Sequence, residues 1–463
     1  MGGDISVPDR KTVRIREQWY ESALGADVAV VGSGSVRRKV VVHNYDRKGK
    51  LQLENKLKIF AGTLGEGGAR EKTFREIRGL KEFKNIIFPM DNPEQPDPRN
   101  DNRYCIFCDL PREFVQKYCV LGKAVGRADF TLHSRVVAAL NIAEVMKTVN
   151  RYFSGMISCV TPAAFYINPE NGDVRVFIEY LLYYDPARVD GGEDYLLCGS
   201  GSRTLKEEDL VKFEAYTIFR LLCVDNPYDG RDTLIQFPLL SATALNQINS
   251  GKYGFIFSGY WNQYSEHIGK EAYQRWRNIP SGLRSLLEAE LNRKQGEGQY
   301  KTTDEWLAYM RMLRDCLVLE NGQFRLCDPD VPSQVLFLQT GDYRIPVKPR
   351  KAVYWYHVGM PEDQFENGIV AGINADGYVE NYSHIQWDIS KPAAAIKLES
   401  RQSIKPEEGM RIDIGGKVLY VICGGNSIQP AFDTGSLAEP LKLMEVQEVD
   451  QENDRDRQRG GGS

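Results

Sequence analysis

Residues 158–180, SCVTPAAFYINPENGDVRVFIEY, contain the segment that decides the fold. Short apolar runs flank Asn171-Gly172, a dipeptide that favours a tight turn with positive backbone φ. The pattern therefore predicts a strand, a turn and a second strand between residues 165 and 177. A carboxylate, that of Glu179, follows the second strand, and a short loop of small residues precedes the first.

The whole chain has the composition of a globular protein. It has 463 residues, of which 42% are hydrophobic and 26% charged, and a formal net charge of −4. This length is enough for about two to four domains of ordinary size. The charge does not predict nucleic acid or an anionic membrane as a partner. No apolar run approaches the roughly 20 residues of a membrane span.

The cysteines indicate a reducing compartment. Nine are scattered along the chain, an odd number without the spacing of a disulfide framework, which predicts free thiols and a cytoplasmic location. Cys105 and Cys108 form a C-x-x-C pair, but no second pair follows at zinc spacing, and the two side chains would point to opposite faces of a strand. We therefore expect ordinary strand cysteines there. The five histidines show no ligand spacing either.

The first part of the chain predicts a small β-rich unit. Apolar and polar residues alternate in short runs, and residues 32–35, GSGS, supply a turn between two of them. The predicted strands are 28–31, 40–42, 56–60, 86–88 and 104–108; the predicted helix is 71–83, and the polar, proline-rich segment 90–103 is a predicted loop.

A helical unit follows, with the strand–turn–strand segment inside it. Apolar residues recur at helical spacing in five further segments. Thr204 with Glu207 three residues on predicts the N-terminal cap of the second of these helices. The predicted helices are 132–152, 205–223, 268–278, 282–294 and 303–318.

The pattern changes near residue 330. Valine, isoleucine and tyrosine recur in short runs broken by glycine and proline, which predicts an all-β domain built as a sandwich. The predicted strands are 335–338, 352–356, 368–371, 395–398, 410–414 and 418–422. We place this domain at residues 331–438. The charged, glycine-ended segment 439–463 is predicted to be a disordered tail.

The order of a β-rich unit and then a helical unit with an internal hairpin resembles the bilobal plan of protein kinases. An ordered set of motifs is similar to a bacterial kinase-like family, encoded beside metal-dependent phosphatases and von Willebrand A-type proteins in gene clusters linked to stress resistance and defence. The resemblance covers residues 15–330 and implies a small lobe at 13–104 and a large lobe at 105–330. The motifs are Phe88-Pro-Met-Asp91, Phe165-Tyr-Ile-Asn-Pro-Glu-Asn-Gly-Asp173, Asn226-Pro-Tyr-Asp-Gly230, Tyr253-Gly-Phe-Ile-Phe257, Trp276 with Pro280, and Thr303-Asp-Glu-Trp306.

The same resemblance implies that the chemistry of a kinase has been lost. Kinases use a loop aspartate, an asparagine about five residues on, and a second aspartate after the hairpin to align the substrate and hold Mg²⁺. Cys159 stands in place of the loop aspartate, Thr161 in place of the lysine that follows it in kinases, and Ala164 in place of the asparagine. Glu179, or Ile178 one residue out of register, stands in place of the second aspartate. Alanine offers Mg²⁺ no oxygen. We therefore expect no productive Mg–ATP cofactor.

The small lobe has partial matches to the residues with which kinases bind the nucleotide. Gly32 and Gly34 match the first two glycines of the phosphate-covering loop, but Arg37 replaces the third, where the backbone must approach the phosphates. The best match to the phosphate-pairing lysine is Lys58, and the best match to its helix glutamate is Glu76. Glu71 is a second match to that glutamate. The alternative interpretation is that this lysine and this glutamate are two solvated charges on the surface.

The C-terminal domain resembles forkhead-associated domains in the segments 380–387, ENYSHIQW, and 408–415, EGMRIDIG. Phosphothreonine capture in that family needs an early-strand arginine, and residues 354–357, YWYH, stand near that position here. Asn381, Ser383 and Arg401 are the candidate phosphopeptide contacts; the alternative is that they are turn and surface residues.

These resemblances imply a catalytically inactive kinase-like scaffold or allosteric regulator that binds protein partners. The implied partners are a phosphatase or a von Willebrand A-type protein encoded nearby. Tyr180, Tyr183 and Tyr184 stand where they would fill the nucleotide cleft. Two alternatives stay open. One is an atypical Ser/Thr kinase using Lys58 and Glu179, with Asp173 or Asp185 in a new role; the other is an interaction module whose lobes only carry the β domain.

Overall fold

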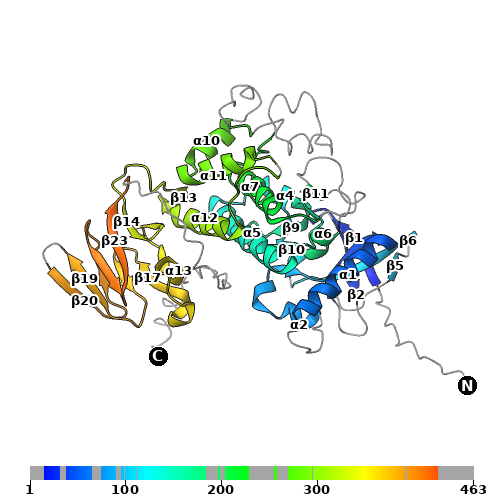
Figure 1. The fold of residues 1–463 in the computed structure, drawn as a ribbon, viewed down its shortest axis with the longest axis horizontal. Helices are drawn as coiled ribbons and strands as arrows, with labels where there is room; N and C mark the ends of the chain where they lie inside the picture. Colours follow the sequence, from blue (N-terminus) through cyan, green and yellow to red (C-terminus); the bar gives the residue numbers. More distant parts are fainter. Residues whose placement is uncertain are drawn as a thin grey trace, which may run out of the picture.

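The protein is an α+β molecule in which three units follow one another along the chain (Figure 1). A sheet from the N-terminal part leads to a helical unit, and two further sheets form the C-terminal unit. The structure is a computed structural model. It describes residues 15–24, 26–31, 38–64, 74–89, 95–97, 100–111, 113–183, 197–198, 204–228, 255–257, 270–294, 296–391 and 394–425.

The N-terminal unit is an antiparallel sheet with the strand order β1-β2-β3-β6-β5. Its strands are β1 Ile15–Glu21, β2 Ala26–Val31, β3 Arg38–Asp46, β5 Gln95–Asp97 and β6 Asn100–Asp109. The predicted strands at 28–31, 40–42 and 104–108 are confirmed. The predicted loop at 90–103 is wrong in part, because β5 and the start of β6 lie within it.

The strand predicted for 56–60 is wrong, because these residues belong to helix α1, Arg47–Thr63. The short window alternates like a strand, but over a longer stretch the buried residues Leu53, Leu57, Phe60 and Ala61 recur at helical spacing. Asp46 begins the helix by accepting a hydrogen bond from the Gly49 N–H. The helix predicted for 71–83 is shorter than expected: α2 covers Phe74–Arg78, and a 3₁₀ turn covers Lys81–Phe83.

The helical unit contains the segment with which the sequence analysis began. The hairpin is confirmed as β9 Phe165–Ile167 and β10 Val174–Phe177, and the predicted strand at 86–88 appears as β4 Ile86–Ile87, parallel to β10. Its longer helices are α5 Leu132–Phe153, α7 Glu207–Cys223, α10 Lys270–Asn278, α11 Ser281–Asn292 and α12 Thr303–Cys316. Its shorter elements are α3 Phe114–Lys117, β7 Cys119–Val120, α4 Leu121–Val125, β8 Cys159–Val160, the 3₁₀ turn Pro162–Ala164, α6 Ile178–Leu182 and β11 Leu197–Cys198.

The cap predicted for the helix at 205–223 is wrong. Helix α7 begins after Lys206, whose backbone N–H donates to the Asp209 carboxylate at 3.0 Å. Glu207 instead accepts from the backbone N–H of Thr303 at 3.0 Å and from its hydroxyl at 2.9 Å. The carboxylate predicted to cap its own helix therefore joins α7 to the start of α12.

The C-terminal unit consists of two sheets that share one apolar core, which confirms its β-rich character. The larger sheet has the order β15-β14-β23-β22-β19-β20 and the smaller β16-β17-β18-β21. A hairpin, β12 Leu317–Glu320 with β13 Gln323–Leu326, precedes them. The strands are β14 Leu336–Thr340, β15 Tyr343–Pro346, β16 Ala352–Tyr354, β17 Ile369–Ile373, β18 Val379–Asn381, β19 Trp387–Lys391, β20 Ala394–Leu398, β21 Ser403–Ile404, β22 Arg411–Ile414 and β23 Lys417–Cys423.

One detail of the C-terminal prediction is wrong, and another is not tested. The strand expected at 352–356 ends at Tyr354, where the short helix α13, Trp355–Val358, begins. The predicted tail at 439–463 lies outside the described residues.

A buried polar joint connects the helical unit to the C-terminal unit. The His357 ring lies against the Asp315 carboxylate, with Nε2 and Oδ2 2.6 Å apart. The His357 Nδ1 accepts the backbone N–H of Tyr354 at 2.9 Å. Nearby, the Lys351 ammonium donates to the carbonyls of Arg314 and Leu317 at 2.8 and 2.9 Å.

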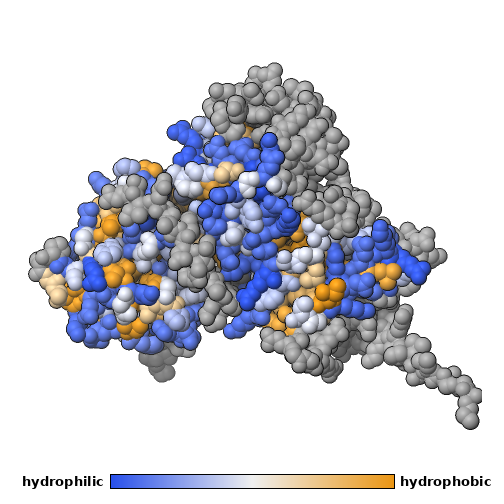
Figure 2. All heavy atoms as spheres, viewed as in Figure 1, coloured by the Kyte–Doolittle hydropathy of each residue, from blue (hydrophilic) through white to orange (hydrophobic). Residues whose placement is uncertain are grey.

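The surface is hydrophilic over most of the described part of the helical unit, whereas hydrophobic residues gather in patches over the C-terminal unit (Figure 2). Among the helices that the structure describes, none combines the length and the apolar character needed to cross a bilayer.

The turn of the β9–β10 hairpin requires glycine at residue 172. Gly172 has a φ of +77°, and a Cβ there would overlap the Ser134 carbonyl on α5. We expect Gly172→Ala to lower the free energy of unfolding by about 3 kcal/mol, because a left-handed backbone and a steric clash both count against it. Gly322→Ala is the matched control, since its φ is +75° with open space around the new Cβ, and it should cost about 1 kcal/mol. Equal losses in chemical denaturation would contradict the packing argument.

The buried contact between His357 and Asp315 should make the protein sensitive to acid. Burial lowers the pKa of His357, and protonation of Nδ1 would also break its bond from Tyr354. The unfolded chain therefore binds more protons at this position than the folded chain as the pH falls through about 6.5, so stability decreases there. Wild type should lose up to about 1.4 kcal/mol per pH unit more than His357→Gln between pH 6.5 and 5.5. Parallel curves for the two proteins in denaturant titrations would count against this assignment.

Candidate functional site

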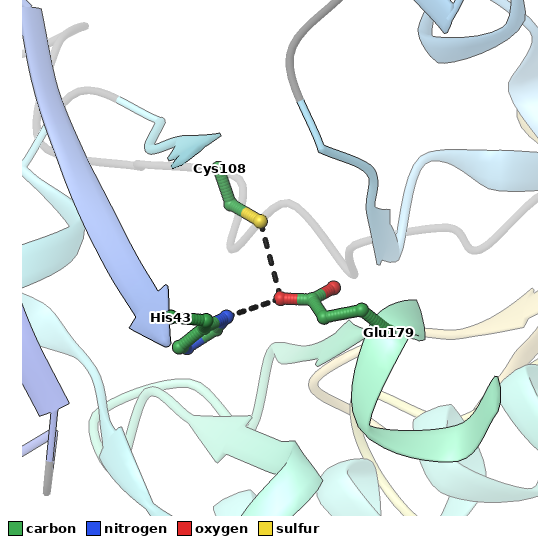
Figure 3. A group of neighbouring side chains, drawn as sticks. All are labelled: His43, Cys108 and Glu179. Carbon is green, nitrogen blue, oxygen red and sulfur yellow. Dashed lines mark hydrogen bonds and ion pairs between the residues drawn. The ribbon is translucent and has the colours of Figure 1, made fainter. Parts of the chain in front are cut away.

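Three side chains from distant parts of the sequence meet between the N-terminal sheet and the helical unit (Figure 3). Strand β3 supplies His43, β6 supplies Cys108 and α6 supplies Glu179. Because Val41 pairs with Cys108 in the sheet register, His43 and Cys108 lie diagonally on one face. The His43 Nδ1 and the Cys108 Sγ both contact Oε1 of Glu179, the sulfur at 3.1 Å.

This group is enclosed. The exposed fraction is 3% for His43 and zero for both Cys108 and Glu179. The rings of Phe177 and Tyr180 contact the imidazole edge-on, with centroids 5.2 and 4.7 Å away. Because a buried carboxylate is costly without partners, the contacts with the imidazole and the thiol are what hold this one in the interior.

An apolar cluster fills the space beside the group, between the sheet and the hairpin. Nine buried residues from the two units make up this cluster: Leu24, Ala26, Val28, Val41, Ile87, Cys108, Phe114, Tyr166 and Phe177. The N-terminal sheet and the helical unit therefore contact each other through packed apolar side chains.

The loop residues predicted to be degenerate catalytic positions are part of the packed interior. Cys159 is buried and its Sγ lies 2.9 Å from the Tyr180 carbonyl. Thr161 is buried, and its hydroxyl accepts the Ala163 N–H at 3.3 Å to begin a 3₁₀ turn. Ala164 is fully buried. None of these three directs a carboxylate or amide oxygen toward Glu179.

The tyrosines after Glu179 pack against the sheet and the start of α1. The Tyr183 ring lies 5.8 Å from the Tyr45 ring, and its hydroxyl is 3.4 Å from the Asp46 carboxylate. A Cβ at Gly49 would overlap the Tyr183 ring, so this close approach depends on glycine. Tyr184 lies outside the described residues.

The structure places Lys58 and Glu76 away from this group of residues. Lys58 is exposed on α1, and Glu76 is exposed on α2. Lys58 was matched to the kinase lysine because a strand was predicted at 56–60, and these residues form part of helix α1 instead. Glu71, Gly32, Gly34 and Arg37 lie outside the described residues.

Sequence analysis missed a different lysine on the same helix. The Lys56 ammonium donates to the Met156 carbonyl at 2.7 Å, to the Ser158 hydroxyl at 2.6 Å and to the Leu182 carbonyl at 2.7 Å. Burial lowers the pKa of Lys56. This side chain fastens α1 to both ends of the segment that contains the degenerate loop and Glu179.

The structure describes one of the two aspartates of the alternative kinase interpretation. Asp173 accepts the Tyr118 hydroxyl and pairs with Arg175 at 2.8 Å, so it is engaged at the hairpin. Asp185 lies outside the described residues.

The phosphopeptide candidates of the C-terminal unit divide into buried and exposed residues. Asn381 and Ser383 are fully buried. The Asn381 amide donates to the carbonyls of Ile385 and Leu398 and accepts the Ser383 hydroxyl, which in turn accepts the Trp387 indole N–H at 3.0 Å. These two residues therefore stabilise the domain and present no group to a peptide.

Arg401 is the exposed member of the phosphopeptide set. Its guanidinium pairs with Glu366 at 3.1 Å and lies over the Tyr382 ring. Its backbone has a φ of +64° and donates to the Asn381 carbonyl.

Among the motifs that carried the family resemblance, the described residues pack within the helical unit, whereas residues 90–91, 229–230 and 253–254 lie outside the described part of the chain. Trp276 stacks on Phe257 and meets Phe255 edge-on. The Asn226 side chain accepts the Tyr228 N–H at 3.0 Å. These contacts stabilise the packing of the helical unit.

A second hollow lies in the helical unit beside the β12–β13 hairpin. This cavity, of about 820 Å³, is lined by four arginines, Arg127, Arg135, Arg275 and Arg325, and the described residues that line it include no aspartate or glutamate. Arg135 is buried and donates to three main-chain carbonyls, of Phe130, Leu221 and Val125. Its burial, with Arg275 nearby, lowers its pKa to about 10. Two of these arginines are already paired with nearby carboxylates, Arg127 with Asp129 at 2.6 Å and Arg275 with Glu271 at 3.2 Å.

Comparison with known proteins assigns no family. The sequence matches no known protein-family profile, and no curated protein matches it.

Lys56 and Lys58 form a matched pair for testing the site. Lys56→Met removes three partly buried hydrogen bonds from a charged donor and should lower the free energy of unfolding by about 2–4 kcal/mol. Lys58→Met makes the same change two residues away on the exposed face of α1 and should shift it by less than about 0.5 kcal/mol. Chemical denaturation followed by circular dichroism measures both. A larger loss for Lys58→Met would contradict the placement of this helix.

Proposed function

We propose that the protein is a catalytically inactive kinase-like scaffold or allosteric regulator that works by binding protein partners. The observation that carries the proposal is the buried Glu179 carboxylate, which is held by His43 and Cys108. In a kinase the carboxylate at this position binds the Mg²⁺ of the nucleotide.

The third strand of the N-terminal sheet supports this proposal. Kinases carry the pattern V-A-I-K on their third strand, and its lysine pairs with the nucleotide phosphates. Strand β3 has Val40-Val41-Val42-His43 at the corresponding place, and His43 contacts Glu179. We infer that a buried histidine–glutamate contact replaces the lysine and the metal, and that this contact closes the site to nucleotide.

The degenerate loop supports it independently. Cys159 and Ala164 are buried and offer no oxygen ligand from their side chains, and the Thr161 hydroxyl is engaged in a turn. A Mg²⁺–triphosphate requires several oxygen ligands. The alternative of an atypical Ser/Thr kinase gains no support, because Lys58 is exposed on α1 and Asp173 is paired with Arg175.

For the partner we keep the class that the family resemblance implies, a phosphatase or a von Willebrand A-type protein. The arginine-lined cavity and the hydrophobic patches of the C-terminal unit are surfaces that suit such a role. A forkhead-associated-like fold for that unit remains part of the proposal. A cytoplasmic location also remains so, supported by seven described cysteines that are all free thiols.

Nucleotide binding tests the proposal. Titration calorimetry of the full chain with ATP and excess Mg²⁺ should show no binding at millimolar nucleotide, and no labelled phosphate should reach the protein or an added substrate. An active protein kinase in the same buffer is the positive control. Metal-dependent ATP binding in the micromolar range, with phosphate transfer abolished by Glu179→Ala, would overturn the proposal.

A further inference from the structure

We propose that His43, Cys108 and Glu179 form a binding site for one divalent transition-metal ion, and that zinc is the ion this donor set suits best. The inference is independent of the kinase-like class, because it rests on the three side chains and their surroundings (Figure 3).

The donor atoms have already converged. A ring nitrogen, a sulfur and a carboxylate oxygen from three separate elements all lie within 4.8 Å of one another. Zinc bonds of about 2.0–2.3 Å in a tetrahedral site place the donors roughly 3.3–3.8 Å apart. The Cys108 sulfur is 3.1 Å from Glu179 Oε1. Small rotations of the His43 and Glu179 side chains would bring all three donors into this range.

The carboxylate has a second oxygen that its neighbours do not satisfy. Glu179 Oε2 is buried, and no residue that the structure describes donates a hydrogen bond to it. An unsatisfied buried carboxylate oxygen is costly. A metal between the three side chains would be bound by this oxygen, alone or together with Oε1.

The donor types select the class of metal. Mg²⁺ and Ca²⁺ prefer oxygen ligands, whereas a cysteine sulfur and an imidazole together favour zinc and its neighbours in the transition series. The charges also balance. Binding displaces the Cys108 thiol proton to solvent, and the thiolate and the carboxylate then neutralise the two positive charges beside a neutral imidazole. The enclosed group would therefore carry no net charge.

The surroundings indicate a structural metal. Among the described residues, no fourth histidine, cysteine or carboxylate joins the group, so the second carboxylate oxygen or a water would complete the coordination. Phe177 and Tyr180 enclose the imidazole. The ion would connect strands β3 and β6 of the N-terminal sheet to helix α6 of the helical unit, and would fix the two units relative to each other.

Metal analysis of the full chain tests the proposal. Because the site is enclosed, the protein is unfolded with chelator, refolded with zinc sulfate, and desalted before its zinc is measured by mass spectrometry. Wild type should retain about one zinc ion per chain, and its melting temperature should exceed that of protein refolded with chelator. His43→Ala and Cys108→Ser should lose at least tenfold in zinc content.

Cys119→Ser is the matched control, because Cys119 is another buried strand cysteine that lies outside the group; it should keep its zinc. Refolding with cobalt tests thiolate ligation directly in wild type and in the Cys119→Ser control, and circular dichroism shows whether Cys108→Ser has folded. Wild type and Cys119→Ser should show a thiolate-to-cobalt charge-transfer band that Cys108→Ser lacks. Two results would overturn the proposal: wild type that retains neither zinc nor cobalt after refolding with the metal, or equal zinc contents in all variants. His43 and Glu179 would then form a hydrogen bond without a metal.

Discussion

The burial of the Glu179 carboxylate is the constraint on which the account of this protein depends. A charged group without exposure must be neutralised or bound by what surrounds it, and here the imidazole of His43 and the thiol of Cys108 meet it from the neighbouring sheet. The contact joins the N-terminal sheet to the helical unit. In the proposed kinase-like interpretation this carboxylate is the group that would bind the metal of a nucleotide, and the contact with His43 and Cys108 engages it internally instead.

Buried or partly buried polar contacts connect several neighbouring parts of the described structure. Lys56 fastens α1 to the loop and to the end of α6, Glu207 joins α7 to α12, and the His357–Asp315 contact connects α12 to the C-terminal unit. Such contacts add orientation to apolar packing, because each is satisfied in one arrangement only. In the proposed role as a scaffold or regulator, these contacts are the places where a bound partner would change the relative positions of the units.

The sequence predicted the parts of the fold that are encoded locally. The Asn171-Gly172 turn, the long apolar helix α5 and the β-rich C-terminal unit have short-range patterns, and they appear as expected. The strand at 56–60 failed because five alternating residues cannot outweigh the helical spacing of Leu53, Leu57 and Phe60 over a longer window. The sequence analysis interpreted Cys108 as an ordinary strand cysteine and gave His43 no role as a ligand, because 71 and 136 residues separate these two from Glu179. Only the pairing of β3 with β6 could have brought them together in advance.

The two interpretations of the site share one geometrical requirement, that the Glu179 carboxylate faces inward. The direct measurement is an experimental structure of the full chain crystallised with Mg²⁺ and an ATP analogue, refined at a resolution that defines this side chain. The account predicts the carboxylate in contact with His43 and Cys108, directly or through a shared ion, and no ordered triphosphate beside it. A carboxylate turned outward onto Mg²⁺, with ordered phosphates between the sheet and the hairpin, would contradict it.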